Sequence, residues 1–160
     1  RNSGARFTCT IVGDGPDAPA LRQLVRTLDL HHSITITGVL SPADVLANYE
    51  AADIFVLAAV SKFHWGIPNV IIEALAMMLP VITTPLPALR EFIEDDHNAI
   101  LVPERDATLL ANALHRLIGD PVLRQRLAKN GRAAVERLFD SQKTIDQLVS
   151  IYDTWIPARP

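Results

Sequence analysis

Glycine is scarce in this chain. Its 160 residues include 7 glycines against 11 prolines, whereas average usage would give roughly 11 glycines and roughly 8 prolines. No glycine repeat of the collagen type is compatible with this count. Hydrophobic residues make up 49% and charged residues 21% of the chain, a balance that excludes intrinsic disorder and is typical of a globular domain with a substantial core.

Cysteine pairs, long apolar runs and an excess of basic charge are absent too. The single cysteine, Cys9, cannot form an internal disulfide, which fits a reducing compartment such as the cytoplasm. No apolar run approaches the roughly 20 residues that span a bilayer. A formal net charge of −3 argues against a general nucleic-acid binder. No spacing typical of a metal site is present, so we expect no metal.

Short apolar strands alternate with amphipathic helices along most of the chain. This alternation predicts an α/β, Rossmann-like parallel sheet with helices on both faces. We expect one partial nucleotide-sugar-binding domain over 1–160, all-helical from about 104 to 160. Ser41, Asp120 and Ser141 are the expected helix caps. The predicted strands cover residues 7–12, 34–37, 53–57, 80–83 and 99–102.

Ligands of such sheets bind beyond the carboxyl ends of the strands. After the first strand, Gly13–Ala18 reads Gly-Asp-Gly-Pro-Asp-Ala and matches the GxGxxA pattern of dinucleotide-binding folds. That pattern also needs an acidic residue at the end of the second strand, where Thr37, Gly38 and Val39 stand. A tight turn therefore explains the glycines better than a dinucleotide-dependent oxidoreductase does.

The helix expected over 68–78 carries one charged residue, Glu73, among apolar neighbours. A lone buried carboxylate costs several kcal/mol unless it is paired or opens onto a polar cleft. Glu73 could bind two ribose hydroxyls, while the amino end of the helix suits a phosphate and Gly66 permits close backbone approach. The alternative reading is purely structural, with Glu73 accepting hydrogen bonds from a nearby loop.

An ordered set of motifs resembles the C-terminal, donor-binding half of retaining GT-B glycosyltransferases, the group 1 or family 4 type. The resemblance covers nearly the whole chain, and the Gly-Ile-Pro-Asn variant is most similar to bacterial exopolysaccharide and colanic-acid-type members. The motifs are Val12–Pro16, Thr37–Leu40, Ala52–Leu57, Gly66–Ala76, Leu79–Thr84, Asn98 with Ile100–Pro103, and Asp120–Pro121.

The resemblance implies a glycosyltransferase that binds a nucleoside-diphosphate sugar between two Rossmann-like domains and transfers the sugar with retention, without a metal or other cofactor. It makes Glu73 the second Glu of the E-x7-E motif, which binds the ribose. The other implied binding positions act through their backbone: Gly66, Ile67 and Asn69 at the diphosphate and sugar, Gly38 and Val39 at the base, and Gly13 and Gly15 at the cleft floor.

Several positions depart from the family pattern. Trp65 stands where the first Glu of E-x7-E is expected, so no catalytic residue is assigned. Glycines of the family pattern are replaced at Met78, Pro87–Ala88, Asp96 and Ala99, which accounts for most of the glycine deficit. A non-catalytic, degenerate family member that serves as a binding or scaffold domain is therefore the alternative to an active enzyme.

The chain starts at Arg1 without an initiator Met, and we expect it to be a piece of a longer protein. The resemblance implies a missing first βα unit, with its diphosphate clamp, and a missing N-terminal domain that holds a glycan or lipid-linked acceptor. The isolated piece is expected to be inactive. We expect the parent protein in the cytoplasm in polysaccharide or glycoconjugate synthesis; peripheral association with the inner face of the membrane stays open. No nucleic-acid partner is expected.

Overall fold

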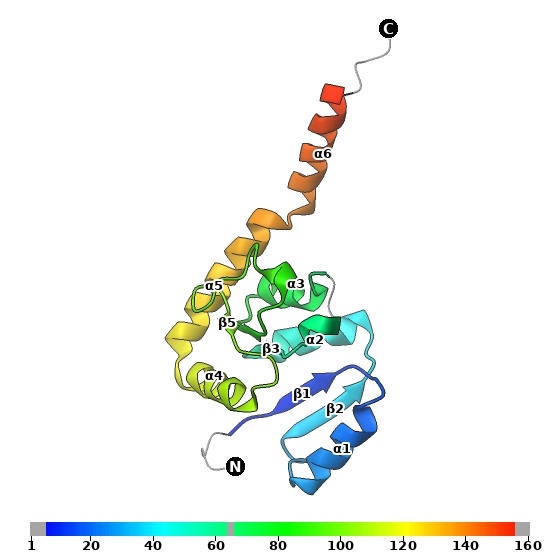
Figure 1. Ribbon diagram of the computed structural model, residues 1–160, viewed down its shortest axis with the longest axis vertical. Coiled ribbons are helices and arrows are strands. Elements are labelled where there is room, and N and C mark those ends of the chain that lie inside the picture. Colours follow the sequence, from blue (N-terminus) through cyan, green and yellow to red (C-terminus); the bar gives the residue numbers. More distant parts are fainter. Residues whose placement is uncertain (1–5, 64–65, 156–160) are drawn as a thin grey trace. The chain divides into compact units, whose positions relative to one another are not determined.

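The computed structural model describes residues 6–63 and 66–155. The chain divides into two compact units, residues 1–52 and 53–160. In the N-terminal unit, each of two parallel strands is followed by a helix, as the ribbon in Figure 1 shows. Its elements are β1 (Cys9–Val12), α1 (Ala18–Thr27), β2 (Ile34–Gly38) and α2 (Pro42–Ala51).

The C-terminal unit begins with three strands and ends in helices (Figure 1). Described elements after residue 104 are all helical, as the sequence predicts. The elements are β3 (Phe55–Leu57), the 3-10 helix η1 (Ser61–Phe63), α3 (Asn69–Ala76), β4 (Val81–Thr83), the 3-10 helix η2 (Pro87–Leu89), β5 (Ile100–Leu101), α4 (Ala107–Gly119), α5 (Pro121–Leu138) and α6 (Ser141–Trp155).

All the described strand pairs are parallel. β1 pairs with β2, and the second group has the order β3-β4-β5. In the second group Leu57 aligns with Thr83, and Thr83 aligns with Leu101, so the three strands end at the same level. Parallel strands separated by helices confirm the predicted α/β class, and the common carboxyl edge is where such folds bind ligands.

The hydrophobic core of the C-terminal unit lies where α4 and α5 cover strands β4 and β5. Leu117 of α4 and Leu127 of α5 are fully buried there, and each contributes about 1.5–3 kcal/mol relative to an exposed side chain. This core joins β4 and β5 to the two helices. Its buried members are Ile82, Ile100, Val102, Ala113, Leu117, Leu123 and Leu127.

Helix caps follow the sequence closely, with one correction. Ser41 Oγ accepts a hydrogen bond from the backbone N–H of Asp44 at 3.2 Å, and Asp120 Oδ1 accepts one from Leu123 at 2.8 Å. The prediction that Ser141 caps the last helix is wrong. The helix begins at Ser141 itself, so Asp140, one residue earlier, is the cap and accepts from the backbone N–H groups of residues 142 and 143.

The helix expected over 68–78 is shorter than predicted. Pro68 occupies the N-cap position, and the helix ends at Ala76. Met78 follows with a left-handed φ of 58°, and the N–H of Leu79 returns to the carbonyl of Ala74 at 3.0 Å. This is a Schellman ending, which glycine usually provides. After β4, residues Pro87–Leu89 form a single 3-10 turn.

Candidate nucleotide-sugar site

The ends of β1 and β2 bring two of the predicted glycines together. The backbone N–H of Gly13 donates to the carbonyl of Gly38 at 2.9 Å. Both glycines have positive φ, 129° and 77°, a conformation that side chains disfavour. Val39, directly after Gly38, is 81% exposed. The two strand ends therefore form a backbone surface that a flat ligand group could approach closely.

Gly15 lies at the entrance to α1 rather than in the glycine pair. Its N–H donates to the carboxylate of Asp14 at 2.9 Å, and its carbonyl accepts from the N–H of Ala18 at 3.0 Å. No heavy atom lies within 4 Å of the place where a Cβ would stand. Gly15 is thus a turn residue that opens the helix, consistent with the tight turn read from the sequence.

The start of α3 carries the predicted residues of the C-terminal unit. Ile67 is partly buried, and Gly66 and Asn69 are exposed. Pro68 gives the first turn of α3 no side-chain hydrogen bond, unlike the aspartate that caps α4. The amino end of this helix therefore presents the positive end of its dipole, which favours an anion.

Glu73 is exposed, so the prediction of a buried carboxylate is wrong. Ile71, Ala74 and Leu75 are fully buried and occupy one side of α3. Asn69 and Glu73 are four residues apart and share the opposite, exposed side. An apolar sequence alone did not reveal which side meets the core. The cost of burying a carboxylate is therefore no longer a reason to give Glu73 a functional role. The reason is instead that Glu73 shares the exposed side of α3 with Asn69.

Trp65 and Cys9 differ in what the structure describes of them. Trp65, where the family pattern has a glutamate, lies outside the described residues. Cys9 is half-buried in β1 and burial raises the pKa of its thiol above the ordinary value, which suits a small packing residue rather than a nucleophile. Among the described residues, no cluster of His, Cys, Asp or Glu could hold a metal ion.

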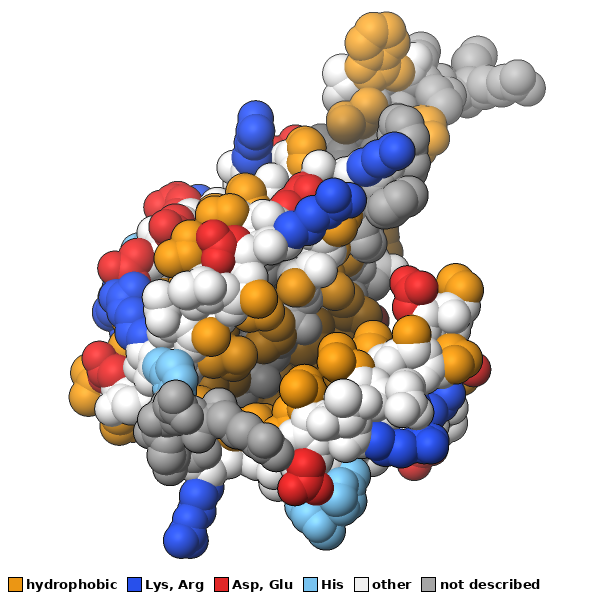
Figure 2. Space-filling model, turned by 60° about the horizontal axis from the view of Figure 1, so that its bottom comes forward, with side chains coloured by type: hydrophobic (Ala, Val, Ile, Leu, Met, Phe, Trp, Pro, Cys, Tyr) orange, Lys and Arg blue, Asp and Glu red, His pale blue; other side chains and the backbone are white. Residues whose placement is uncertain are grey.

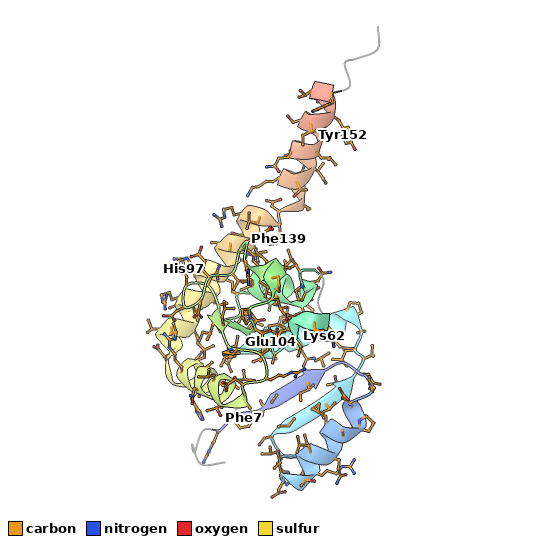
Figure 3. The ribbon with its side chains drawn as sticks, viewed as in Figure 1. Phe7, Lys62, His97, Glu104, Phe139 and Tyr152 are labelled. Atoms are coloured by element: carbon orange, nitrogen blue, oxygen red, sulfur yellow. The ribbon has the colours of Figure 1, made fainter. Side chains whose placement is uncertain are left out.

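Sequence reasoning missed Glu104, which follows β5. One of its carboxylate oxygens, Oε1, accepts a hydrogen bond from the backbone N–H of Ser61 at 2.7 Å, and Figure 3 labels its position. Hydrogen bonds from the hydroxyl and the N–H of Ser61 hold the pKa of the Glu104 carboxyl below its ordinary value. The two residues are 43 positions apart, so no local pattern pointed to the contact.

The surface carries charges of both signs. On the face that Figure 2 shows, basic and acidic side chains are interspersed, in keeping with the net charge of −3. Within the described part of the chain, no helix is both long and apolar enough to cross a membrane.

Comparison with known proteins identifies the family. A family model described as "Glycosyl transferases group 1" matches residues 1–120. Alpha-D-kanosaminyltransferase of Streptomyces kanamyceticus is 32% identical over 89% of this chain and 36% of its own length. A putative colanic acid biosynthesis glycosyltransferase, WcaL of Escherichia coli, is 31% identical over 94% of this chain and 38% of its own length. The chain thus spans well under half of these relatives.

Solved structures agree on the fold. The C-terminal domain of a group 1 family glycosyl transferase, LpcC of Francisella tularensis, is 31% identical with a TM-score of 0.72, covering 82% of this chain and 69% of that one. Anabaena HepE, solved in complex with UDP, is 22% identical with a TM-score of 0.76, covering 90% of this chain and 41% of that one. These neighbours are GT-B glycosyltransferases, so the predicted fold class is confirmed.

Proposed function

Because the chain belongs to the group 1 glycosyl transferase family, we propose that it is the donor-binding part of a glycosyltransferase and binds a nucleoside-diphosphate sugar. The observation that carries the proposal is the start of α3, where Asn69 and Glu73 share the exposed side of a helix whose amino end has no side-chain cap. A diphosphate suits that helix end. A carboxylate one turn further along the helix can accept hydrogen bonds from both ribose hydroxyl groups.

The glycine pair of the N-terminal unit supports the same function from a second place. Gly13 and Gly38 have positive φ, and no heavy atom lies within 4 Å of the place where a Cβ would stand on either. We assign Gly38 and Val39 to the base, and Gly13 and Gly15 to the floor of the cleft. Anabaena HepE has been solved in complex with UDP, which supports a nucleotide as the ligand.

For the parent protein we propose retaining transfer of the sugar to a glycan or lipid-linked acceptor held by a further domain, with no metal or other cofactor. The E. coli relative is named for colanic acid biosynthesis, which supports a role in polysaccharide synthesis. The isolated chain is proposed to bind the donor without turnover, because the family's first Glu of E-x7-E is replaced by Trp65.

Trp65 also favours a second candidate, a family member that binds without catalysis. An indole cannot accept a hydroxyl proton or stabilise developing positive charge as a carboxylate can. Release of nucleoside diphosphate by the parent protein from a panel of sugar nucleotides would exclude this candidate. Binding of the nucleotide with no release under any condition would support it.

Calorimetric titration of the 160-residue chain with UDP, GDP and NAD tests the proposal. We expect one of the two nucleoside diphosphates to bind and NAD not to bind. Glu73→Gln should weaken that binding about tenfold or more, the size of lost charge-assisted hydrogen bonds. Glu50→Gln, a change at an exposed glutamate of α2, is the matched control and should bind as the wild type does. Binding of NAD alone would contradict the proposal and point to a dinucleotide fold.

A further inference from the structure

The segment that follows β3, residues 58–63, is held by side chains that lie at or after the ends of β4 and β5. Thr83 Oγ1 donates to the carbonyl of Leu57 at 3.0 Å. Thr84 Oγ1 donates to the carbonyl of Ala59 at 2.7 Å. Both threonines are almost fully buried, with 1% and 2% of their surface exposed, so the two hydrogen bonds are shielded from water and well defined.

Glu104 continues this series one step further. The threonines bind the backbone at positions 57 and 59, and Glu104 accepts from the N–H at position 61. The three contacts, called the brace below, therefore hold the backbone at every second position from Leu57 to Ser61. The third contact is the only one of the three made by a charged side chain.

The position of the third contact has a specific effect. Ser61 begins the 3-10 helix η1, and its N–H is one of those that a short helix leaves without an internal partner. A carboxylate that accepts this N–H fixes the direction in which the chain leaves the strand. The chain then reaches Gly66 and the start of α3, the proposed contact with the diphosphate.

We propose that Glu104 is a positioning residue for the nucleotide-sugar site, which it prepares by holding Ser61 and the segment after β3 in place. The inference rests on the proposed function. Glu104 acts through the Ser61 backbone and does not touch the ligand. A segment fixed before binding loses less conformational entropy when the ligand arrives, so the brace contributes to affinity without forming a contact of its own.

The test compares UDP and GDP binding to the full 160-residue chain in four forms. Glu104→Ala removes the acceptor, Glu104→Gln keeps an Oε1 acceptor without the charge, and Glu50→Ala is a matched control at an exposed glutamate. We expect Glu104→Ala to weaken the binding of the nucleotide about tenfold and to speed hydrogen exchange at the Ser61 amide. Glu104→Gln should stay within about threefold of wild type, and the unfolding midpoint of Glu104→Ala should match that of the control.

Ser61→Pro provides a second, independent route. Proline lacks the donor N–H and is tolerated in the first turn of a helix. This variant should weaken binding to a similar extent, and combining it with Glu104→Ala should add nothing further, because both changes break one contact. Additive losses would show that Glu104 acts elsewhere and would overturn the proposal.

Two results separate the failure of this inference from failure of the proposed function. If the wild type binds a nucleoside diphosphate and Glu104→Ala binds it equally well, Glu104 has no positioning role while the proposed function survives. If the wild type binds neither UDP nor GDP, the proposed function fails and the positioning role fails with it. If Glu104→Ala and Glu104→Gln both weaken nucleotide binding to the same extent, the proposal is also contradicted. The effect would then come from the charge of Glu104 at the ligand and not from its hydrogen bond to Ser61.

Discussion

The two units use glycine for different physical reasons. In the N-terminal unit, Gly13 and Gly38 have positive φ and no atom within 4 Å of a Cβ placed on them, so conformation requires glycine and space does not. In the C-terminal unit, Gly131 of α5 has no positive φ, but an added Cβ would lie 2.4 Å from Leu75 Cδ2 and 3.2 Å from the carbonyl of Asn98. There the close approach of α5 to α3 requires glycine.

Left-handed residues in the C-terminal unit are not glycines. Met78, Asp96 and Arg105 have φ values of 58°, 56° and 61°. The family resemblance expects glycine at the first two, where Met78 and Asp96 adopt the positive φ that glycine favours. Positive φ is thus carried by glycine at Gly13 and Gly38 in the N-terminal unit and by other residue types in the C-terminal unit.

Asp96, which stands where the family pattern has a glycine, is held by two arginines. Its carboxylate lies 2.7 Å from the guanidinium of Arg116, and its carbonyl accepts from Arg126 at 2.8 Å. About half of the Arg116 and Asp96 side chains is exposed, so the ion pair is worth no more than about 1 kcal/mol. The loop around Asp96 therefore depends more on its buried member, Asn98.

The largest expected loss of stability comes from removing the Asn98 side chain, which holds the loop around Asp96. Asn98 is 3% exposed, donates to the carbonyl of Phe92 at 2.7 Å and accepts from the N–H of Glu94 at 2.8 Å. Asn98→Ala leaves both backbone groups without these partners, so we expect a loss of about 2–4 kcal/mol in the free energy of unfolding in urea. Asn48→Ala, at a partly buried asparagine of α2, should lose less than about 1 kcal/mol. Equal losses would contradict the assignment.

Gly131→Ala comes next, because it tests the requirement for space. The added methyl group must displace the buried Leu75 side chain, and we expect a loss of about 1–3 kcal/mol in urea unfolding. Gly119→Ala, at the end of α4 with no atom within 4 Å of its Cβ position, is the control. It should be neutral or slightly stabilising. If both variants behave alike, α3 and α5 are not in close contact at this glycine.

Gly38→Ala tests the requirement for conformation. Its φ of 77° costs an alanine about 1–2 kcal/mol, which thermal unfolding should register as a lower midpoint. Gly15→Ala, an exposed glycine of the same unit without a positive φ, should change stability by less than about 0.5 kcal/mol. A Gly38→Ala chain as stable as the Gly15→Ala chain would remove the contrast between the units.

The smallest effect is a gain. Helices α1 and α3 both finish in Schellman turns, with Asp29 (φ 54°) and Met78 (φ 58°) at the left-handed position. Met78→Gly should stabilise the chain by about 0.5–1 kcal/mol, since relief of the left-handed strain exceeds the entropic cost of glycine. Asp29→Gly should gain less, because aspartate tolerates this conformation better. A larger gain at Asp29, measured by urea unfolding, would reverse the interpretation.

Local patterns in the sequence were sufficient for much of the fold. Alternating short strands and amphipathic helices predicted the parallel α/β class, and Ser41 and Asp120 followed from the known preferences of capped helices. The glycine turns at Gly13 and Gly38 were placed correctly at the strand ends, because positive φ and glycine go together.

Other features depend on tertiary contacts that no local pattern contains. The exposure of Glu73 depends on what packs against Ile71 and Leu75 on the other side of α3. Because the sequence of α3 is apolar on every side, it does not predict which side faces the core. The hydrogen bond between Glu104 and Ser61 joins residues 43 positions apart. Met78 and Asp96 keep glycine-like backbones with other side chains, which residue type alone would not have predicted.

The central claim is that the chain binds a nucleoside diphosphate at the start of α3. A two-dimensional NMR titration of the ¹⁵N-labelled chain with UDP, or with GDP if GDP is the nucleotide that binds, tests it most directly. The account predicts that the largest amide shifts in the C-terminal unit fall on Gly66 and Asn69, and that helices α5 and α6 stay unchanged. Saturable shifts confined to α5 or α6, or no shifts with either nucleotide, would contradict it.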